Sequence, residues 1–416
     1  MTARSAPLDP ALWGEKRLSA GVLGSPFIFD LNFDGLNEVI VTDTGGKVIA
    51  LTVATGEILW ERNLKVSVTA AVAGFFLGAE KPIGVVVGGQ DGAVYLLNGN
   101  TGELVSKTDL QGAPFNRSPT LLPLEYAQTP LRDGAVLIDD DGKISALEFG
   151  DDGNGFPLWR RETSSTPSGP PAVGNVMGTE GISVIVATRY SGIHVLAPET
   201  GAEKAVFTGL HGGKEITTPI TLADLYGTGV PVILVGDNLG QLHGMKVTQG
   251  ELTECAGYPV RQLEVATQPP LPVDVDGTGK EDLFYVSAVT ITRIRGESGA
   301  KVGPSFSAST SIATPLTLIT GAKGEKLAYF HDVSGAPYML NLKTNTETLR
   351  SGIKFSGFGK PPVIAGSGPG GESYLLIAHS SQPILRLVLS GIETDHEALQ
   401  WPCYLGSALH SNRVDD

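Results

Sequence analysis

The pattern with the clearest chemical meaning lies near the start of the 416-residue chain. Oxygen-bearing side chains alternate there at Asp30, Asn32, Asp34 and Glu38, and Gly35 permits a sharp turn between them. Oxygens at alternate positions followed by a glycine can wrap a hard cation, as the first half of an EF-hand loop does. With the carbonyl of Leu36 added, the many flexible ligands favour Ca²⁺ over Mg²⁺. The alternative is a turn whose side chains bond their own backbone.

A second copy of this spacing predicts a second calcium loop. Its ligands would be Asp274, Asp276, Thr278, the carbonyl of Lys280 and Asp282. A related segment begins at Asp224, but Val232 replaces the last carboxylate, so we expect no ion there. Ions in such loops would be structural and would stabilise turns; they would not form a catalytic centre.

Other residue types that could support catalysis are present but are not arranged for it. The sequence contains no His-x-His or His-Glu-x-x-His spacing for zinc, no Gly-x-Ser-x-Gly elbow and no P-loop. The histidines are scattered singly, at His194, His211, His243, His331, His379, His396 and His410. The run Asp139–Asp141 is interpreted as an acidic hairpin tip. These patterns predict a protein that is not an enzyme.

The elements that must position these residues follow from an internal repeat. A segment marked by proline or alanine precedes an apolar run eight times, at steps of 45 to 52 residues. The marking residues are Pro26, Ala71, Pro119, Pro171, Pro219, Pro270, Pro315 and Pro362. The repeat therefore fills the chain, and the whole length forms one domain.

Each repeat has the same plan of strands and glycine turns. In the first, residues 38–42 and 47–51 read as strands around Thr44-Gly45-Gly46, and Thr55-Gly56 leads into residues 58–62. Glycine supplies the positive φ that tight hairpin turns need. The 54 glycines of the chain fit many such turns. His194, His243 and Tyr95 take equivalent third-strand positions and are predicted to face the core or a central channel.

Four short antiparallel strands in a unit of about 48 residues are typical of a β-propeller blade. The fold class is therefore predicted as all-β, a single propeller of eight blades over residues 1–416, with seven blades the weaker alternative. The expected blades cover residues 20–65, 66–111, 112–164, 165–210, 211–260, 261–309, 310–357 and 358–416. Either residues 11–18 or residues 397–404 could supply the strand that closes the ring, and the first are favoured.

Three tryptophans recur at fourth-strand positions, Trp13, Trp60 and Trp159. We expect their rings to be wedged between blades, with a carbohydrate platform as the minor alternative. Cys255 and Cys403 are too few for a disulfide framework. Two inert core thiols are favoured over one long-range disulfide.

The repeats resemble two related propeller families. The run Gly46 to Trp60, Gly-x-Val-x-Ala-Leu-x-x-x-Thr-Gly-x-x-x-Trp, resembles PQQ-like repeats. The loops at 30–38 and 274–282 resemble FG-GAP or VCBS repeats of the integrin-α type, with Glu38 where that family more often has aspartate. The second resemblance implies structural Ca²⁺. Quinoprotein dehydrogenases of the first kind carry paired cysteines, which this chain lacks, so no PQQ is expected.

Bulk properties exclude several classes of partner. The net charge of −14 and the absence of any long Lys/Arg block argue against nucleic acid, and no stretch is apolar enough to span a bilayer. The first residues contain no apolar segment of a signal peptide. The family resemblances nevertheless favour an extracytoplasmic, periplasmic or secreted, location.

These observations together predict a non-enzymatic scaffold that binds a protein partner on a loop face of the ring. A propeller that binds carbohydrate or another small ligand is the alternative. A quinone-dependent dehydrogenase with a degenerate site ranks third.

Overall fold

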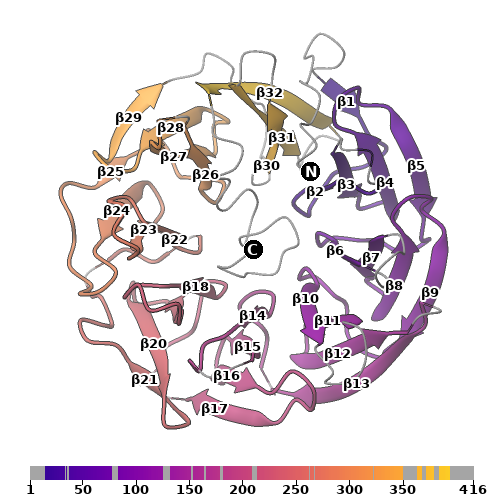
Figure 1. Cartoon of the computed structure of the whole chain (residues 1–416), viewed down its shortest axis with the longest axis horizontal. Helices are drawn as coiled ribbons and strands as arrows, with labels where there is room; N and C mark the ends of the chain where they lie inside the picture. Colours follow the sequence, from indigo (N-terminus) through magenta and orange to yellow (C-terminus); the bar gives the residue numbers. More distant parts are fainter. Residues whose placement is uncertain are drawn as a thin grey trace.

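The computed structural model describes residues 15–32, 34, 37–76, 83–124, 132–150, 153–163, 165–178, 181–208, 213–261, 263–266, 268–321, 323–349, 363–367, 372–378 and 384–393. Within these residues the chain forms eight four-stranded antiparallel sheets. Figure 1 shows the sheets set around a central axis, with the first strand of each nearest the centre. The predicted all-β, eight-bladed propeller is confirmed.

Blades one to four follow each other along the chain. Their strands, from the centre outward, are β2 (Phe27–Phe29), β3 (Glu38–Thr42), β4 (Lys47–Thr52) and β5 (Ile58–Asn63); β6 (Ala73–Phe76), β7 (Ile83–Gly88), β8 (Ala93–Asn98) and β9 (Leu104–Asp109); β10 (Thr120–Leu124), β11 (Arg132–Ile138), β12 (Lys143–Phe149) and β13 (Gly155–Glu162); and β14 (Ala172–Gly174), β15 (Ser183–Thr188), β16 (Gly192–Leu196) and β17 (Glu203–Phe207).

Blades five to eight continue the ring. Their strands are β18 (Thr221–Ala223), β19 (Val232–Gly236), β20 (Leu242–Thr248) and β21 (Glu251–Glu254); β22 (Leu271–Val273), β23 (Asp282–Val286), β24 (Thr290–Ile294) and β25 (Phe306–Ser307); β26 (Thr317–Thr320), β27 (Lys326–His331), β28 (Pro337–Asn341) and β29 (Thr346–Leu349); and β30 (Val363–Ser367), β31 (Glu372–Ala378), β32 (Ile384–Glu393) and β1 (Glu15–Arg17).

The eighth blade joins the two ends of the ring. Strand β1 is its outermost strand and pairs antiparallel with β32, so that Arg17 lies opposite Ile384. Of the two closures that the sequence leaves open, the structure has the one made by the N-terminal segment. Residues 397–404 lie outside the described residues.

The hairpin turns require glycine where the backbone enters the left-handed region. Gly46, between β3 and β4, has φ of 90°, and a Cβ there would lie 2.3 Å from the carbonyl oxygen of Val66. Any other residue would be strained twice, by its backbone conformation and by this contact. The turn therefore explains why Gly-Gly and Asp-Gly pairs mark the repeat.

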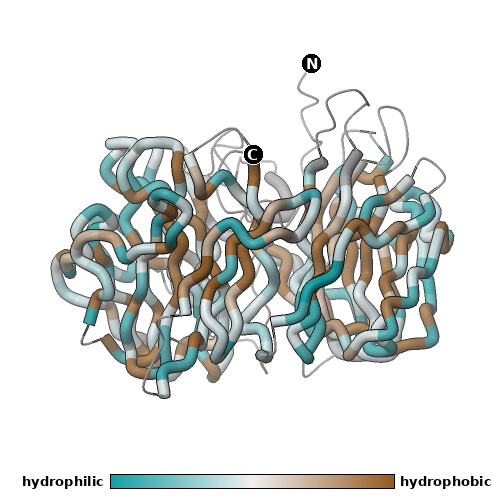
Figure 2. Tube along the Cα trace, turned by 90° about the horizontal axis from the view of Figure 1, so that it is seen from below, coloured by the Kyte–Doolittle hydropathy of each residue, from teal (hydrophilic) through white to brown (hydrophobic). Residues whose placement is uncertain are grey.

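The hydrophobic core lies mainly between neighbouring blades. One cluster joins Phe27 and Ile40 of blade one to Val85 of blade two, and another joins Val41 of blade one to Leu376 of blade eight. The core thus continues across the ring closure. Figure 2 shows hydrophobic residues along many of the strands and hydrophilic ones at many of the turns. No helix in the described part of the chain is long and apolar enough to cross a membrane.

Two of the three fourth-strand tryptophans lock neighbouring blades together. Trp60 Nε1 donates to the carbonyl of Gly99 at 2.7 Å, and Trp159 Nε1 donates to the carbonyl of Pro198 at 2.7 Å. Each ring is 8% exposed, which confirms the predicted wedge and leaves these rings unavailable as a sugar platform. Trp13 lies outside the described residues.

Candidate functional site

The first predicted calcium loop connects β2 to β3 and is held by its own side chains. The Asp34 backbone N–H lies 3.2 Å from Asp30 Oδ1 and 2.9 Å from Asn32 Oδ1, and Asn32 Nδ2 donates to Asp34 Oδ2 at 3.0 Å. Glu38 Oε2 accepts the backbone N–H of Leu31 at 2.8 Å. Four of the five predicted ligands therefore belong to one turn. The fifth, Leu36, lies outside the described residues.

Negative charge is concentrated around Glu38. The Glu38 residue is 1% exposed, and burial raises its pKa to about 7, although the hydrogen bond from Leu31 opposes this shift. The charges of Asp34 and Asp30 raise the pKa further. Among the described residues, no ion pair involves Glu38. A positive charge near Glu38 would favour its ionised form.

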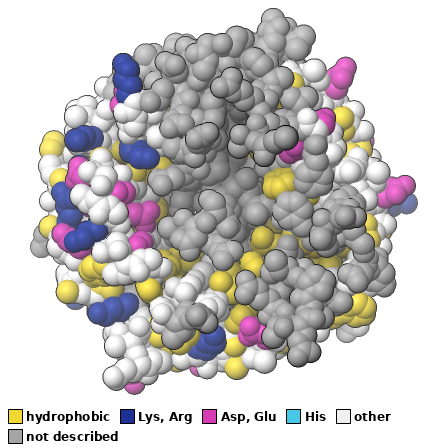
Figure 3. Space-filling view, viewed as in Figure 1, with side chains coloured by type: hydrophobic (Ala, Val, Ile, Leu, Met, Phe, Trp, Pro, Cys, Tyr) yellow, Lys and Arg dark blue, Asp and Glu magenta, His cyan; other side chains and the backbone are white. Residues whose placement is uncertain are grey.

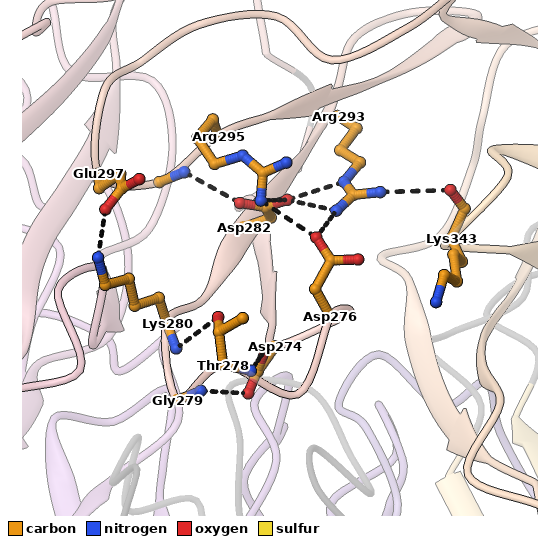
Figure 4. A network of polar contacts seen from close by, with 11 residues as sticks. Asp274, Asp276, Thr278, Gly279, Lys280, Asp282, Arg293, Arg295, Glu297 and Lys343 are labelled. Atoms are coloured by element: carbon orange, nitrogen blue, oxygen red, sulfur yellow. Dashed lines mark hydrogen bonds and ion pairs between the residues drawn. The ribbon is translucent and has the colours of Figure 1, made fainter.

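The second predicted loop connects β22 to β23, and its carboxylates face arginines (Figure 4). Arg293 Nη2 lies 2.9 Å from Asp276 Oδ2 and 2.7 Å from Asp282 Oδ2. Arg295 Nη1 lies 3.1 Å from Asp276 Oδ2 and 3.3 Å from Asp282 Oδ2. Hydrogen bonds and charge from Arg295 and Arg293 hold the pKa of Asp276 below its usual range.

Two other predicted ligands of the second loop accept hydrogen bonds within it. Asp274 accepts the backbone N–H groups of Thr278 at 3.0 Å and Gly279 at 2.7 Å, and Thr278 Oγ1 accepts that of Lys280 at 3.4 Å. The Lys280 ammonium adds a further positive charge beside the loop and pairs with Glu297 at 2.5 Å. The residues present therefore do not fit a divalent cation in this loop. Figure 3 shows blade six, at the left, as a region where charged side chains of both signs gather.

The candidate metal ligands are the histidine, cysteine and acidic side chains of the described ranges, the loops 30–38 and 274–282 included. Within these ranges, no group of three or more of them is brought together to hold a metal ion. Cys255 is a free, buried thiol whose pKa is raised by burial, and Cys403 lies outside the described residues. Calcium in the first loop stays a prediction.

The loop of blade five, where we expect no ion, contacts blade six instead. Glu281 Oε2 accepts the backbone N–H of Asp224 at 2.6 Å, and the Glu281 N–H donates to the Asp224 carbonyl at 3.1 Å. Burial raises the pKa of Glu281 to about 7, and the charges of Asp224 and Asp274 add to the shift. This contact joins two neighbouring blades through one carboxylate.

The third-strand residues of the repeat lie among acidic partners. His243 is 2% exposed and lies between Asp237, 3.1 Å from its Nε2, and Glu254, 2.7 Å from its Nδ1. His194 Nδ1 lies 2.9 Å from Glu203 Oε2, and Tyr95 donates to Asp91 Oδ2 at 2.6 Å. His243 and Tyr95 are buried residues of the blades, as expected for core positions.

Sequence reasoning missed a set of buried aspartates that close the turn after the second strand. Asp139 is 1% exposed and its Oδ1 accepts the N–H groups of Asp141 and Lys143. Only Asp140 and Asp141 lie at the acidic tip that the sequence predicts. The same turn, with an aspartate 0–2% exposed, occurs at Asp43, Asp237 and Asp332. Their spacing of two repeats is the signal that could have identified them.

One face of the ring is built from these turns and from the connections between blades, because antiparallel blades place both at the same end. We call it the turn face. Backbone hydrogen bonds tie several of these turns to the connection that enters the same blade: Gln90 to Ser67 in blade two, Arg189 to Thr166 in blade four and Asn238 to Glu215 in blade five. The loops of this face are therefore held by the ring itself.

The turn face differs between its two halves. In blades two and three the tips are Asp91 and Asp141, and a polar network links Gln90, Asn116 and Asp140. Further round the ring, exposed apolar side chains occupy the turns of blades four, five and seven and the connection into blade six. This exposed apolar set consists of Tyr190 (60%), Leu239 (56%), Val265 (45%) and Val333 (41%).

Comparison with known proteins adds the following. Residues 44–239 match the sequence model of a family described as "Outer membrane protein assembly factor BamB" (PQQ_2). No curated protein sequence matches the chain. The matching family covers the PQQ-like resemblance, while the FG-GAP or VCBS resemblance of the two loops stays a prediction.

Several solved structures share the fold. BamB from Moraxella catarrhalis is 16% identical, with a TM-score of 0.60 over 90% of this chain and 98% of that one. Sqt1 from Saccharomyces cerevisiae is 14% identical, with a TM-score of 0.65 over 94% and 99%. A europium-containing methanol dehydrogenase is 11% identical, with a TM-score of 0.59 over 88% and 84%. At these identities the likeness shows the propeller fold alone.

Proposed function

The chain belongs to the PQQ-like β-propellers, and we propose that it is a non-enzymatic scaffold that binds another protein through its turn face. The observation that carries this proposal is the exposed apolar set on blades four to seven. Apolar side chains on one face of a rigid ring can pack against a partner with little loss of conformational entropy. The name of the matching family, an assembly factor, supports the same kind of role.

Other features of the molecule favour this function over the alternatives. The rings of Trp60 and Trp159 are engaged between blades, so the aromatic residues best suited to stack on sugars are occupied. Among the described residues, the histidines with hydrogen bonds to acidic side chains, such as His243, lie within blades. Neither arrangement offers a reaction centre, and a protein partner remains the better occupant for the turn face.

The turn face can be tested with a matched pair of variants. Leu239 on the turn face is 56% exposed and Phe156 on the outer strand β13 is 55% exposed. Three proteins would be immobilised and exposed to an extract of the source organism: the parent chain, the turn-face double variant Leu239→Asp/Tyr190→Ser, and the outer-strand variant Phe156→Ser. We expect the parent chain and the Phe156→Ser variant to retain the same protein and the turn-face double variant to lose it. Loss with Phe156→Ser instead would overturn the assignment of this face.

We further propose that the loop 30–38 holds one structural Ca²⁺. Asp30, Asn32, Asp34 and Glu38 would supply oxygens, and the ion would offset the burial and the neighbouring negative charges that raise the Glu38 pKa. An extracytoplasmic location is proposed with it, because calcium loops of this kind suit such compartments and because the family name refers to the outer membrane. Cell fractionation with an antibody against the chain tests the location.

A further inference from the structure

The two arginines of blade six form a buried charged cluster. The side chain of Arg293 is 6% exposed and that of Asp282 is 5% exposed. A buried charge is stable only when it is paired and hydrogen-bonded. Arg293 meets this condition fully, because its Nε donates to Asp282 Oδ2 at 2.8 Å and its Nη1 donates to the carbonyl of Lys343 at 3.2 Å. Lys343 follows β28, so the same guanidinium also joins blade six to blade seven.

The arginines contact the two carboxylates that were predicted to bind the cation. Asp276 Oδ2 and Asp282 Oδ2 each receive both guanidinium groups, at distances of 2.7 to 3.3 Å. Figure 4 shows both guanidinium groups directed at Asp276 and Asp282, with dashed lines to each carboxylate. A positive charge therefore bridges the second and the last acidic positions of the motif, as a bound divalent ion would.

The strand register identifies what stands at the same positions in blade one. Arg293 lies opposite Phe284, two residues after Asp282. In blade one, Ala50 lies opposite Ile40, two residues after Glu38, and Thr52 lies opposite Glu38 itself. Blade one therefore has Ala50 and Thr52 where blade six has Arg293 and Arg295. The same acidic motif therefore occurs with arginines at these two positions in blade six, Arg293 on β24 and Arg295 just after it, and without them in blade one.

We propose that Arg293 and Arg295 take the place of a divalent cation in the loop 274–282. The loop of blade six is then neutralised by the chain itself and binds no calcium. The conformation of this loop, and the bond from Arg293 to the Lys343 carbonyl of blade seven, are therefore independent of the calcium concentration. This proposal does not depend on a protein partner.

The test converts blade six to the residues of blade one in a chain whose first loop is disabled. Asp34→Ala removes a predicted ligand of loop 30–38 and serves as the background. Calcium binding by calorimetry and the unfolding midpoint with calcium or with chelator would be measured for this background and for the same chain with Arg293→Ala and Arg295→Thr. We expect no calcium response in the background and a rise of about 3 °C or more with calcium in the converted chain.

Two results would overturn the proposal. The first is calcium binding by the Asp34→Ala chain, because loop 274–282 would then bind the ion although both arginines are in place. The other is a folded converted chain whose midpoint does not respond to calcium. If the double change prevents folding without calcium, refolding of the same chain is measured in excess calcium. Recovery of the folded state with calcium supports the proposal, and no recovery opposes it.

Discussion

The loops 30–38 and 274–282 share one acidic motif, but their carboxylates have different surroundings. In blade one, Glu38 is buried beside Asp30 and Asp34, and its pKa rises to about 7. In blade six, Arg293 of β24 and Arg295 just after it lie within 2.7 to 3.3 Å of Asp276 and Asp282, and the pKa of Asp276 is lowered. The comparison teaches that a ligand pattern alone does not define a metal site, because residues at the third strand can pair with the same carboxylates, as Arg293 does with Asp276 and Asp282.

Removing the buried guanidinium should have the largest effect. Arg293→Ala removes the nearer of the two guanidinium groups that pair with the buried Asp282, so we expect the free energy of unfolding to fall by about 3–5 kcal/mol. Denaturant unfolding measures this change. The control is Arg189→Ala, whose side chain is 51% exposed and pairs with Glu215, and which should cost only about 0–1 kcal/mol. Equal losses in both variants would contradict the importance of burial in blade six.

Calcium removal should act on blade one. With calcium at about a hundred times its dissociation constant, the bound ion adds about 2.7 kcal/mol of stability. Chelation should therefore lower the unfolding midpoint by several degrees while the protein stays folded. In the Asp34→Ala chain the midpoints with calcium and with chelator should coincide. An unchanged midpoint of the parent chain in excess chelator would remove the calcium proposal for this loop.

The pH dependence of stability tests Glu281, a carboxylate of blade six that the two arginines do not contact. Glu281 has a folded pKa of about 7 against an ordinary value of 4.5. The stability that comes from its protonated form is fully present below about pH 4.5 and is lost as the pH rises through about 7. Glu281→Gln mimics the protonated form, so it should stabilise the protein by about 2 kcal/mol at pH 8 and have no effect near pH 4.5. A pH-independent difference between the two chains would refute this explanation.

The smallest effect is expected at the surface of the same loop. Lys280 and Glu297 form an ion pair whose side chains are 46% and 43% exposed. Solvent screens such pairs, so Lys280→Ala should leave the unfolding midpoint and the calcium response unchanged. Thermal unfolding at low and at moderate salt checks this expectation. A marked loss at both salt concentrations would show that Lys280 acts through more than this pair.

The repeat made the architecture predictable, but the contacts between strands and between blades could not be predicted from it. Eight matched registers and their glycine turns predict eight blades because each turn, such as that at Gly46, needs a residue without Cβ. The wedge of Trp60 and Trp159 followed from their equivalent positions. The pairing of Asp276 with Arg293 did not, because the two residues lie 17 positions apart on different elements. Locating the exposed apolar set on one part of the turn face would also have required an alignment of the turns of all the repeats.

The pairing of β1 with β32 determines when the ring can close during synthesis. The ribosome makes β1 before the other strands of the ring, yet its partner β32 emerges only after seven intervening blades. Until then, the inner strands of blade one present an apolar surface that will later contact Leu376 and Leu385. The nascent chain must therefore carry an open, growing arc that cannot be sealed before residue 384 is available. A premature stop within the last blade would remove both the final strands and the site that secures the first one.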